Sequence, residues 1–220
     1  RDVRRMTENI RNTGKDVENV FPTLGAERIL ARDLTIKYGS NVVLKSLNAT
    51  VRAGEIVALM GRNGAGKSSL LTALVGLQKP DSGTSHICGK ASAELKGKVR
   101  RETVGFIPQE PSDLLYGQSV VGECQQGDKD NQIAPGTTFA LLQRIVPSVS
   151  PDTHPRDLSE GQRLALALAI VLSAQPQVLI LDEPTRGLDY QSKALLVTLL
   201  RNFSKELGRC VLIATHDVEL

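Results

Sequence analysis

The segment Gly61-Arg62-Asn63-Gly64-Ala65-Gly66-Lys67-Ser68 decides how the rest of the chain is interpreted, because it fits the pattern Gly-x-x-x-x-Gly-Lys-Ser/Thr. The compact, mostly apolar residues 55–60 before it predict a strand, and residues 67 to about 77 predict a helix. In such a unit the glycines let the backbone curl, so that successive N–H groups converge on phosphates. The positive end of the helix dipole adds to this. A glycine-rich turn that matches by chance is the alternative, and the strand–loop–helix context argues against it.

Two side chains at the end of this loop have specific tasks in phosphate binding. We expect Lys67 to reach the β- and γ-phosphates of a nucleotide and the hydroxyl of Ser68 to bind Mg²⁺. The residues predicted to contact the nucleotide here are Gly61, Asn63, Gly64, Ala65, Gly66, Lys67, Ser68 and Ser69.

A second motif consists of the apolar run 178–181 followed by Asp182 and Glu183. A buried strand would deliver Asp182 to its carboxyl end, where ligands bind in open α/β sheets. We expect Asp182 to hold Mg²⁺, largely through water, and Glu183 to activate the water that attacks the γ-phosphorus. Taken alone, an exposed Asp-Glu pair at a strand end is the alternative. The phosphate loop favours the metal site.

The pentapeptide Leu158-Ser159-Glu160-Gly161-Gln162 precedes this strand, with Gln162 lying 20 positions before Asp182. At a helix start, it resembles the signature motif of ATP-binding-cassette (ABC) ATPases. Further matches to the family occur in the family's order: Tyr38-Gly39 as the aromatic loop that stacks on adenine, Gln109 of the Q-loop, Gly187-Leu188-Asp189 as the D-loop, and His216 as the switch histidine. Taken alone, the tyrosine, the glutamine and the histidine would each be an ordinary core or surface residue.

The resemblance covers residues 28–220 and implies an α/β P-loop NTPase fold. Its expected parts are a mainly parallel RecA-like core, an antiparallel β subdomain and a helical subdomain, about 110–174, that carries the signature motif. Independently, apolar strands that alternate with helices predict a mainly parallel sheet covered on both faces. We expect a linker or disordered leader at 1–25, and an ATPase domain at 26–220 that is truncated at its C-terminus.

The resemblance also implies the cofactors ATP and Mg²⁺ and assigns roles to individual residues. Glu183, Gln109 and His216 would be catalytic, and Ser68, Gln109 and Asp182 would serve the metal. Ser159, with the N–H groups of Gly161 and Gln162, would form a second phosphate-binding helix start. In the family this start faces the phosphate loop of another cassette, in a head-to-tail dimer of two chains or within a fused chain. Ser159 also fits an ordinary N-cap. Glu160 departs from the usual glycine, and a carboxylate near a phosphate is unfavourable unless it points away.

The implied function is to power a membrane transporter from the cytoplasmic face of the membrane, together with a transmembrane subunit. Residues 182–189 and 109–123 resemble energy-coupling-factor transporters, which import vitamins or transition-metal ions, and residues 110–123 are the candidate contact with the membrane partner. The alternative is a soluble ABC ATPase acting in translation or DNA maintenance. No heptads occur between Lys67 and Ser159, which argues against the repair branch. A P-loop kinase or GTPase would lack the signature motif and the switch histidine.

Composition narrows these classes further. The 27 basic and 24 acidic residues leave a net charge of +3, too small to indicate a nucleic-acid partner. Three scattered cysteines predict neither a disulfide framework nor a zinc site. The apolar stretch 164–172 is too short to span a bilayer. Elsewhere the pattern predicts two short strands, Val42–Leu44 and Leu47–Val51, a polar loop at Gln125–Pro135 and a helix at Ala140–Val146.

Overall fold

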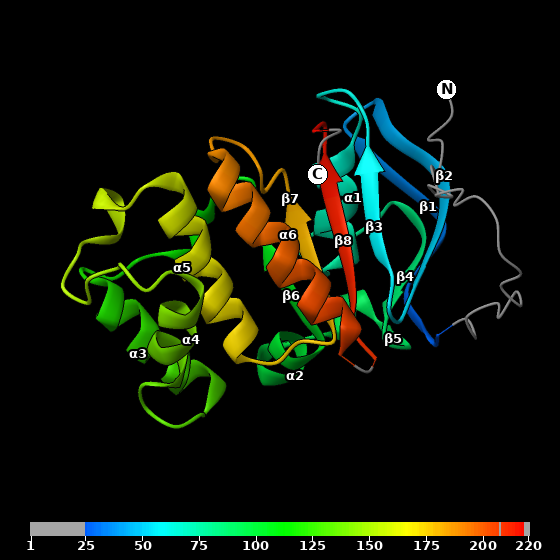
Figure 1. Cartoon of the computed structure of the whole chain (residues 1–220). Coiled ribbons are helices and arrows are strands. Elements are labelled where there is room, and N and C mark those ends of the chain that lie inside the picture. The colour runs from blue at the N-terminus through cyan, green and yellow to red at the C-terminus, as the bar shows by residue number, and fades with distance from the viewer. Residues whose placement is uncertain (1–24, 207, 218–220) are drawn as a thin grey trace, which may run out of the picture.

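The computed structural model describes residues 25–206 and 208–217 (Figure 1). The predicted leader, residues 1–25, therefore lies outside the described residues except for Gly25. One of the two sheets is parallel. Its strands, in spatial order, are β3 (Ile56–Met60), β8 (Cys210–Thr215), β7 (Val178–Asp182) and β6 (Val104–Ile107).

The two central strands of this sheet, β7 and β8, are buried along their whole length. This matches their uninterrupted apolar sequences, because strands covered on both faces need no alternation of polar residues. Helix α1 (Lys67–Leu74) packs on one face, with Leu70, Leu71 and Leu74 in the core. Helices α5 (Glu160–Ser173) and α6 (Tyr190–Lys205) cover the other face (Figure 1).

The second sheet is antiparallel, in the order β2-β1-β4-β5. Its strands are β1 (Glu27–Tyr38), β2 (Asn41–Arg52), β4 (Ser82–Ile87) and β5 (Lys90–Ala91). The prediction of two short strands at 42–44 and 47–51 was wrong, because both belong to β2. Lys45 and Ser46 lie between them; Ser46 has φ 47°, and the β1–β2 register shifts there without breaking the ladder, as in a β-bulge.

The helices outside the parallel sheet are α2 (Gly97–Thr103), α3 (Val120–Asn131) and α4 (Thr137–Ile145). Helices α3 and α4 pack on α5 around a separate apolar cluster that includes Leu142 and Leu166. Short 3₁₀ turns occupy η1 (Ser92–Glu94), η2 (Pro111–Leu114) and η3 (Pro155–Asp157). None of the helices in the described part of the chain is long and apolar enough to cross a membrane.

The polar loop predicted at Gln125–Pro135 was wrong over most of its length, because α3 continues to Asn131. Its buried polar side chains have partners that the sequence pattern does not reveal. The carboxylate of Asp128 accepts hydrogen bonds from the backbone N–H groups of Gly136 and Thr138, at 2.6 and 2.8 Å, and so fastens the start of α4. Buried polar groups are tolerated when they are paired in this way.

Candidate nucleotide-binding and catalytic site

The loop between β3 and α1 has the backbone geometry of a phosphate cradle. Gly64 and Gly66 have φ values of 80° and 89°, in the left-handed region that favours glycine. A Cβ atom added at Gly66 would lie 2.8 Å from Cγ1 of Val43, so a larger residue does not fit there. Asn63, Gly64 and Ala65 are exposed, which leaves the loop accessible to a ligand.

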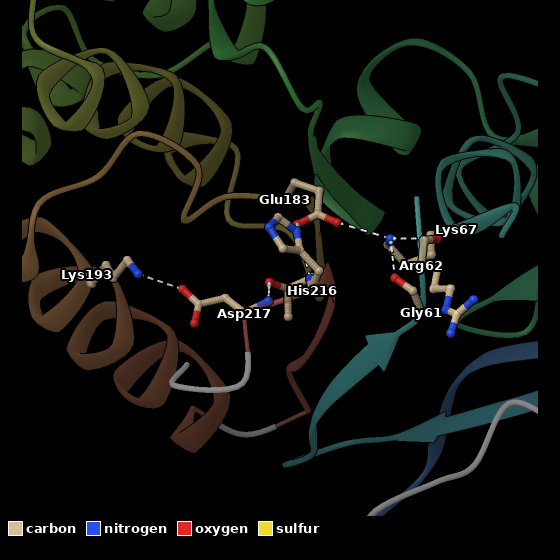
Figure 2. Close-up of polar contacts among 8 residues, drawn as sticks. Gly61, Arg62, Lys67, Glu183, Lys193, His216 and Asp217 are labelled. Carbon is tan, nitrogen blue, oxygen red and sulfur yellow. Dashed lines mark hydrogen bonds and ion pairs between the residues drawn. The ribbon is translucent and has the colours of Figure 1, made fainter. Parts of the chain in front are cut away.

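Lys67 holds its ammonium group inside this loop (Figure 2). Its Nζ donates to the carbonyl oxygen of Gly61 at 2.8 Å and lies 3.1 Å from Oε1 of Glu183. Both side chains of this ion pair are less than a tenth exposed. The cation is therefore oriented by the loop and by the acidic strand together, at the place where the sequence predicts the β- and γ-phosphates.

Glu183 connects the loop to the end of β8. Its Oε2 accepts from the backbone N–H of His216 at 3.2 Å and lies 2.7 Å from Nδ1 of the same residue (Figure 2). Burial alone would raise the pKa of the Glu183 carboxyl, but the contacts with Lys67 and His216 outweigh it and hold the pKa below its usual value. Glu183 is therefore a carboxylate at neutral pH, which is the form that a general base requires.

Asp182 has a different environment from its neighbour Glu183. Burial, together with the charge of Glu183, raises the pKa of Asp182 despite a hydrogen bond from Ser68 and the charge of Lys67. Among the described residues no hydrogen-bond partner reaches its buried Oδ1. An unsatisfied carboxylate oxygen beside a hydroxyl is a hard-oxygen donor set of the kind that Mg²⁺ takes. The residues present therefore fit the ion.

Gln109 is exposed and follows β6 by one residue. It lines a cavity of about 220 Å³ together with Glu183 and Glu160. The structure thus places Gln109 and the candidate base around one space, whose lining does not include Ser68 or Asp182.

Ser159 begins helix α5 with a capping box. Its Oγ accepts from the N–H of Gln162, and Oε1 of Gln162 accepts from the N–H of Ser159, at 3.3 and 3.0 Å. A Cβ atom on Gly161 would lie 2.5 Å from Oγ of Ser192 in α6, so the close packing of the two helices requires glycine here. The groove that Ser159, Gly161 and Gln162 line includes no residue of the phosphate loop. The two helix starts that the sequence predicts to bind phosphate therefore do not line this groove together.

Glu160, which stands where the resembled motif usually has glycine, has its charge paired within its own helix. Its carboxylate pairs with the guanidinium of Arg163, one turn along α5, at 2.8 Å. Its Cγ would lie 3.2 Å from a Cβ atom at Gly187, in the D-loop. The side chain therefore fills space beside the D-loop, and its charge is compensated within its own helix.

Tyr38 lies at the end of β1 and is 55% exposed. Its hydroxyl donates to Oε1 of Gln78 at 2.9 Å and lies 3.2 Å from Oγ of Ser69 in α1. The aromatic ring is thus tied to the helix that follows the phosphate loop.

The sequence did not indicate two ion pairs around the site. Arg186 pairs with Glu110 at 2.9 Å, joining the segment after Glu183 to the segment after Gln109. Lys193 of α6 lies 2.6 Å from Asp217, whose N–H donates to Oγ1 of Thr215 (Figure 2). No local pattern indicates either pair, because the partners lie 76 and 24 positions apart in the chain.

Comparison with known proteins identifies the family. Residues 44–186 match the family model of ABC transporters. The chain is 48% identical over 98% of its length to a putative ABC transporter ATP-binding protein of Streptomyces coelicolor. It is 35% identical over 85% of its length to the putative HMP/thiamine import ATP-binding protein YkoD of Bacillus subtilis. It covers 38% and 34% of these two proteins, and thus spans little more than a third of the length of each.

Two solved structures share the fold. The first is cbiO1 of Clostridium perfringens, described as part of the ABC transporter complex cbiONQ. It superimposes with a TM-score of 0.71 at 32% identity, covering 87% of this chain and 79% of that one. The second is a dimeric ATP-binding cassette in a post-hydrolysis state, bound to ADP and Pi. It superimposes with a TM-score of 0.76 at 25% identity, covering 87% of this chain and 89% of that one. The P-loop NTPase fold predicted from the sequence is confirmed, and the chain belongs to the ATP-binding-cassette family as one of its ATPase domains, whose cofactors are ATP and Mg²⁺.

Proposed function

We propose that this chain is the ATP-hydrolysing domain that powers a membrane transporter of the energy-coupling-factor type. The observation that carries the proposal is the convergence of Lys67, Glu183 and His216 between the phosphate loop and the ends of β7 and β8. The domain would comprise residues 26–220, with its helical subdomain at about 110–174.

The residues of the site divide the work of hydrolysis among them. Lys67 would bind and orient the terminal phosphates, since its Nζ already points into the loop. Ser68, Asp182 and Gln109 would hold Mg²⁺, which when bound draws negative charge from the triphosphate. Glu183 would accept a proton from the attacking water at Oε1, the oxygen that the structure pairs with Lys67. His216 would keep the carboxylate in place through its contacts with Oε2.

A second cassette would complete the site. The N-terminus of α5 lies with α3 and α4, whereas α1 lies on the other face of the parallel sheet (Figure 1). In our proposal the capped start at Ser159 faces the phosphates of a partner cassette, since the groove that it lines includes no residue of its own phosphate loop. A head-to-tail partner, either a second copy or a cassette in the same polypeptide, would supply the missing half of each site, as dimeric relatives of this fold suggest.

Residues 110–123 offer a surface for a membrane partner. Tyr116 is 84% exposed, and it borders a cavity of about 510 Å³ with Leu115 and Arg156. An exposed aromatic ring beside an open hollow is typical of protein interfaces. The segment is continuous with Gln109, so binding there would be communicated directly to the Mg²⁺ site. In this proposal the domain lies at the cytoplasmic face of the membrane.

The proposed cargo is a vitamin or a transition-metal ion that is imported. Its support is the likeness to YkoD, whose name refers to HMP/thiamine import, and to the cbiONQ component. The test is to purify the full-length protein with its membrane partner in vesicles and to measure ATP turnover and uptake of thiamine precursors, cobalt and nickel. Turnover that requires neither a second cassette nor a membrane subunit would refute the proposal, and uptake of none of these cargoes would refute its substrate class.

A further inference from the structure

The side chain of Tyr38 is exposed over more than half of its surface and yet fixed by hydrogen bonds. An exposed tyrosine without a partner samples several rotamers, and ordering it on ligand binding reduces affinity. The acceptor that fixes this ring is Oε1 of Gln78, at 2.9 Å from the hydroxyl. No recognised motif of the chain includes Gln78.

Gln78 is itself firmly placed. It lies just beyond α1, and its backbone N–H donates to the carbonyl oxygen of Thr72 at 3.2 Å. Its Oε1 also lies 3.1 Å from Oγ1 of Thr72, whose hydroxyl contacts the carbonyl oxygen of Ser68. Gln78 therefore fixes Tyr38 relative to the helix that carries Lys67 and Ser68.

A second contact ties the same two segments together. Oδ2 of Asp81 accepts from the N–H of Lys37 at 2.7 Å, and the N–H of Asp81 donates to the carbonyl oxygen of Thr35 at 2.9 Å. The end of β1 is thus held to the turn that follows α1. Within this frame the hydroxyl contacts with Gln78 and Ser69 hold the outer end of the Tyr38 ring.

We propose that Gln78 is a positioning residue for nucleotide recognition, which holds the Tyr38 ring ready to stack on the base of ATP. This inference rests on the proposed role of Tyr38 as the base-stacking residue. It separates two parts of the ligand: the phosphate loop binds the triphosphate, and the Gln78–Tyr38 pair acts on the base alone. Because one neutral hydrogen bond orders one side chain, we expect an effect of about three- to tenfold on affinity.

The experiment measures two ligands on the full chain by calorimetry, MgATP and magnesium tripolyphosphate, which carries no base. Gln78→Leu should lower the affinity for MgATP about three- to tenfold and leave the affinity for tripolyphosphate unchanged. Tyr38→Phe, which keeps the ring and removes the hydroxyl, should reproduce this loss, and the double variant should lose no more than either single variant. In turnover assays Gln78→Leu should raise KM for ATP without lowering kcat. Gln126→Leu, at an exposed glutamine of α3, is the matched control.

Three results would overturn the inference. Unchanged affinity of Gln78→Leu for MgATP would show that the ring needs no support. An equal loss for tripolyphosphate would show that the substitution disturbs α1 and not the base contact. Additive losses in the double variant would show that Gln78 and Tyr38 act independently. In all three cases the proposed function stands, provided that the unaltered chain binds both ligands. Failure to bind either ligand would instead refute the phosphate site and the inference with it.

Discussion

Replacing Glu183 by glutamine separates the two roles that the structure gives this carboxylate. In the nucleotide-free chain the substitution removes a negative charge 3.1 Å from the buried ammonium of Lys67. Breaking a buried ion pair can cost 3–5 kcal/mol, but glutamine still offers Lys67 a carbonyl oxygen and Gly61 still accepts from it. We therefore expect the free energy of unfolding to fall by about 1–3 kcal/mol, and Tm by about 2–12 °C.

With MgATP bound, the same substitution should preserve binding and impair hydrolysis. The phosphates replace Glu183 as the counter-ion of Lys67, so affinity for MgATP should be retained or increased. Turnover should fall by about 10²- to 10⁴-fold, the typical contribution of a general base.

The assay combines thermal melts of the nucleotide-free chain, calorimetry with MgATP and phosphate release by the full-length protein. The control is Glu206→Gln, which removes an exposed carboxylate paired with Arg209 and should change Tm very little. Unchanged turnover would refute the role of Glu183 as the base. An unchanged Tm would refute the energetic importance of its contact with Lys67.

Three further substitutions test neighbouring features. Lys67→Ala should weaken MgATP by about 100-fold or more, since it removes the charge inside the phosphate loop, and calorimetry that shows unaltered affinity would contradict this. Asp182→Asn should raise the Tm of the nucleotide-free chain, because burial raises the pKa of Asp182 and so penalises its charged form. The same substitution should abolish the Mg²⁺ dependence of nucleotide binding. A lower Tm would contradict the view that the Asp182 carboxylate is destabilising without a bound ion. Asp128→Asn should cost about 1–3 kcal/mol in urea unfolding at neutral pH. Burial opposes the charge of Asp128, but the hydrogen bonds from Thr138 and Gly136 outweigh it and lower the pKa of this carboxyl below its usual value. The difference in the free energy of unfolding between Asp128→Asn and the unaltered chain should therefore be full at neutral pH and shrink as the pH falls through this lowered pKa. A difference that is the same at all pH values would exclude the carboxylate as its source.

The sequence predicts the parallel sheet well because its strands are apolar without interruption. Strand β3 begins one residue inside the predicted strand 55–60 and ends where predicted, and β7 extends the predicted strand 178–181 by Asp182 alone. Helix α3 was missed because its buried face includes Glu123, Asp128 and Asn131, which resemble solvent-exposed loop residues. Their hydrogen bonds reach segments that precede or follow α3, and no periodicity of apolar residues reports such pairing.

In the candidate site, too, the sequence predicts the residues with local patterns but not the contacts between distant segments. Motif order identifies Lys67, Asp182, Glu183 and His216, since each follows a strand or opens a helix in a recognisable pattern. The sequence does not predict that Lys67 pairs with Glu183, or that Glu110 pairs with Arg186 over a separation of 76 residues. Such pairs depend on which strands are neighbours and on the rotamer of each side chain, and neither is encoded in a local pattern.

The topology explains why these residues meet. Strands β3, β8, β7 and β6 are parallel and in a continuous register, with Leu181 opposite Ile213 and Leu59 opposite Ala214. Their carboxyl ends therefore lie at one edge of the sheet, where each strand delivers one component: the phosphate loop, His216, the Asp182–Glu183 pair and Gln109. Because β8 lies between β3 and β7, the end of β8 necessarily separates the phosphate loop from the acidic motif. Glu183 bridges this gap, with one carboxylate oxygen at Lys67 and the other at His216. A nucleotide that drew Lys67 toward its phosphates would therefore also free Oε1, the oxygen that we propose accepts a proton from water.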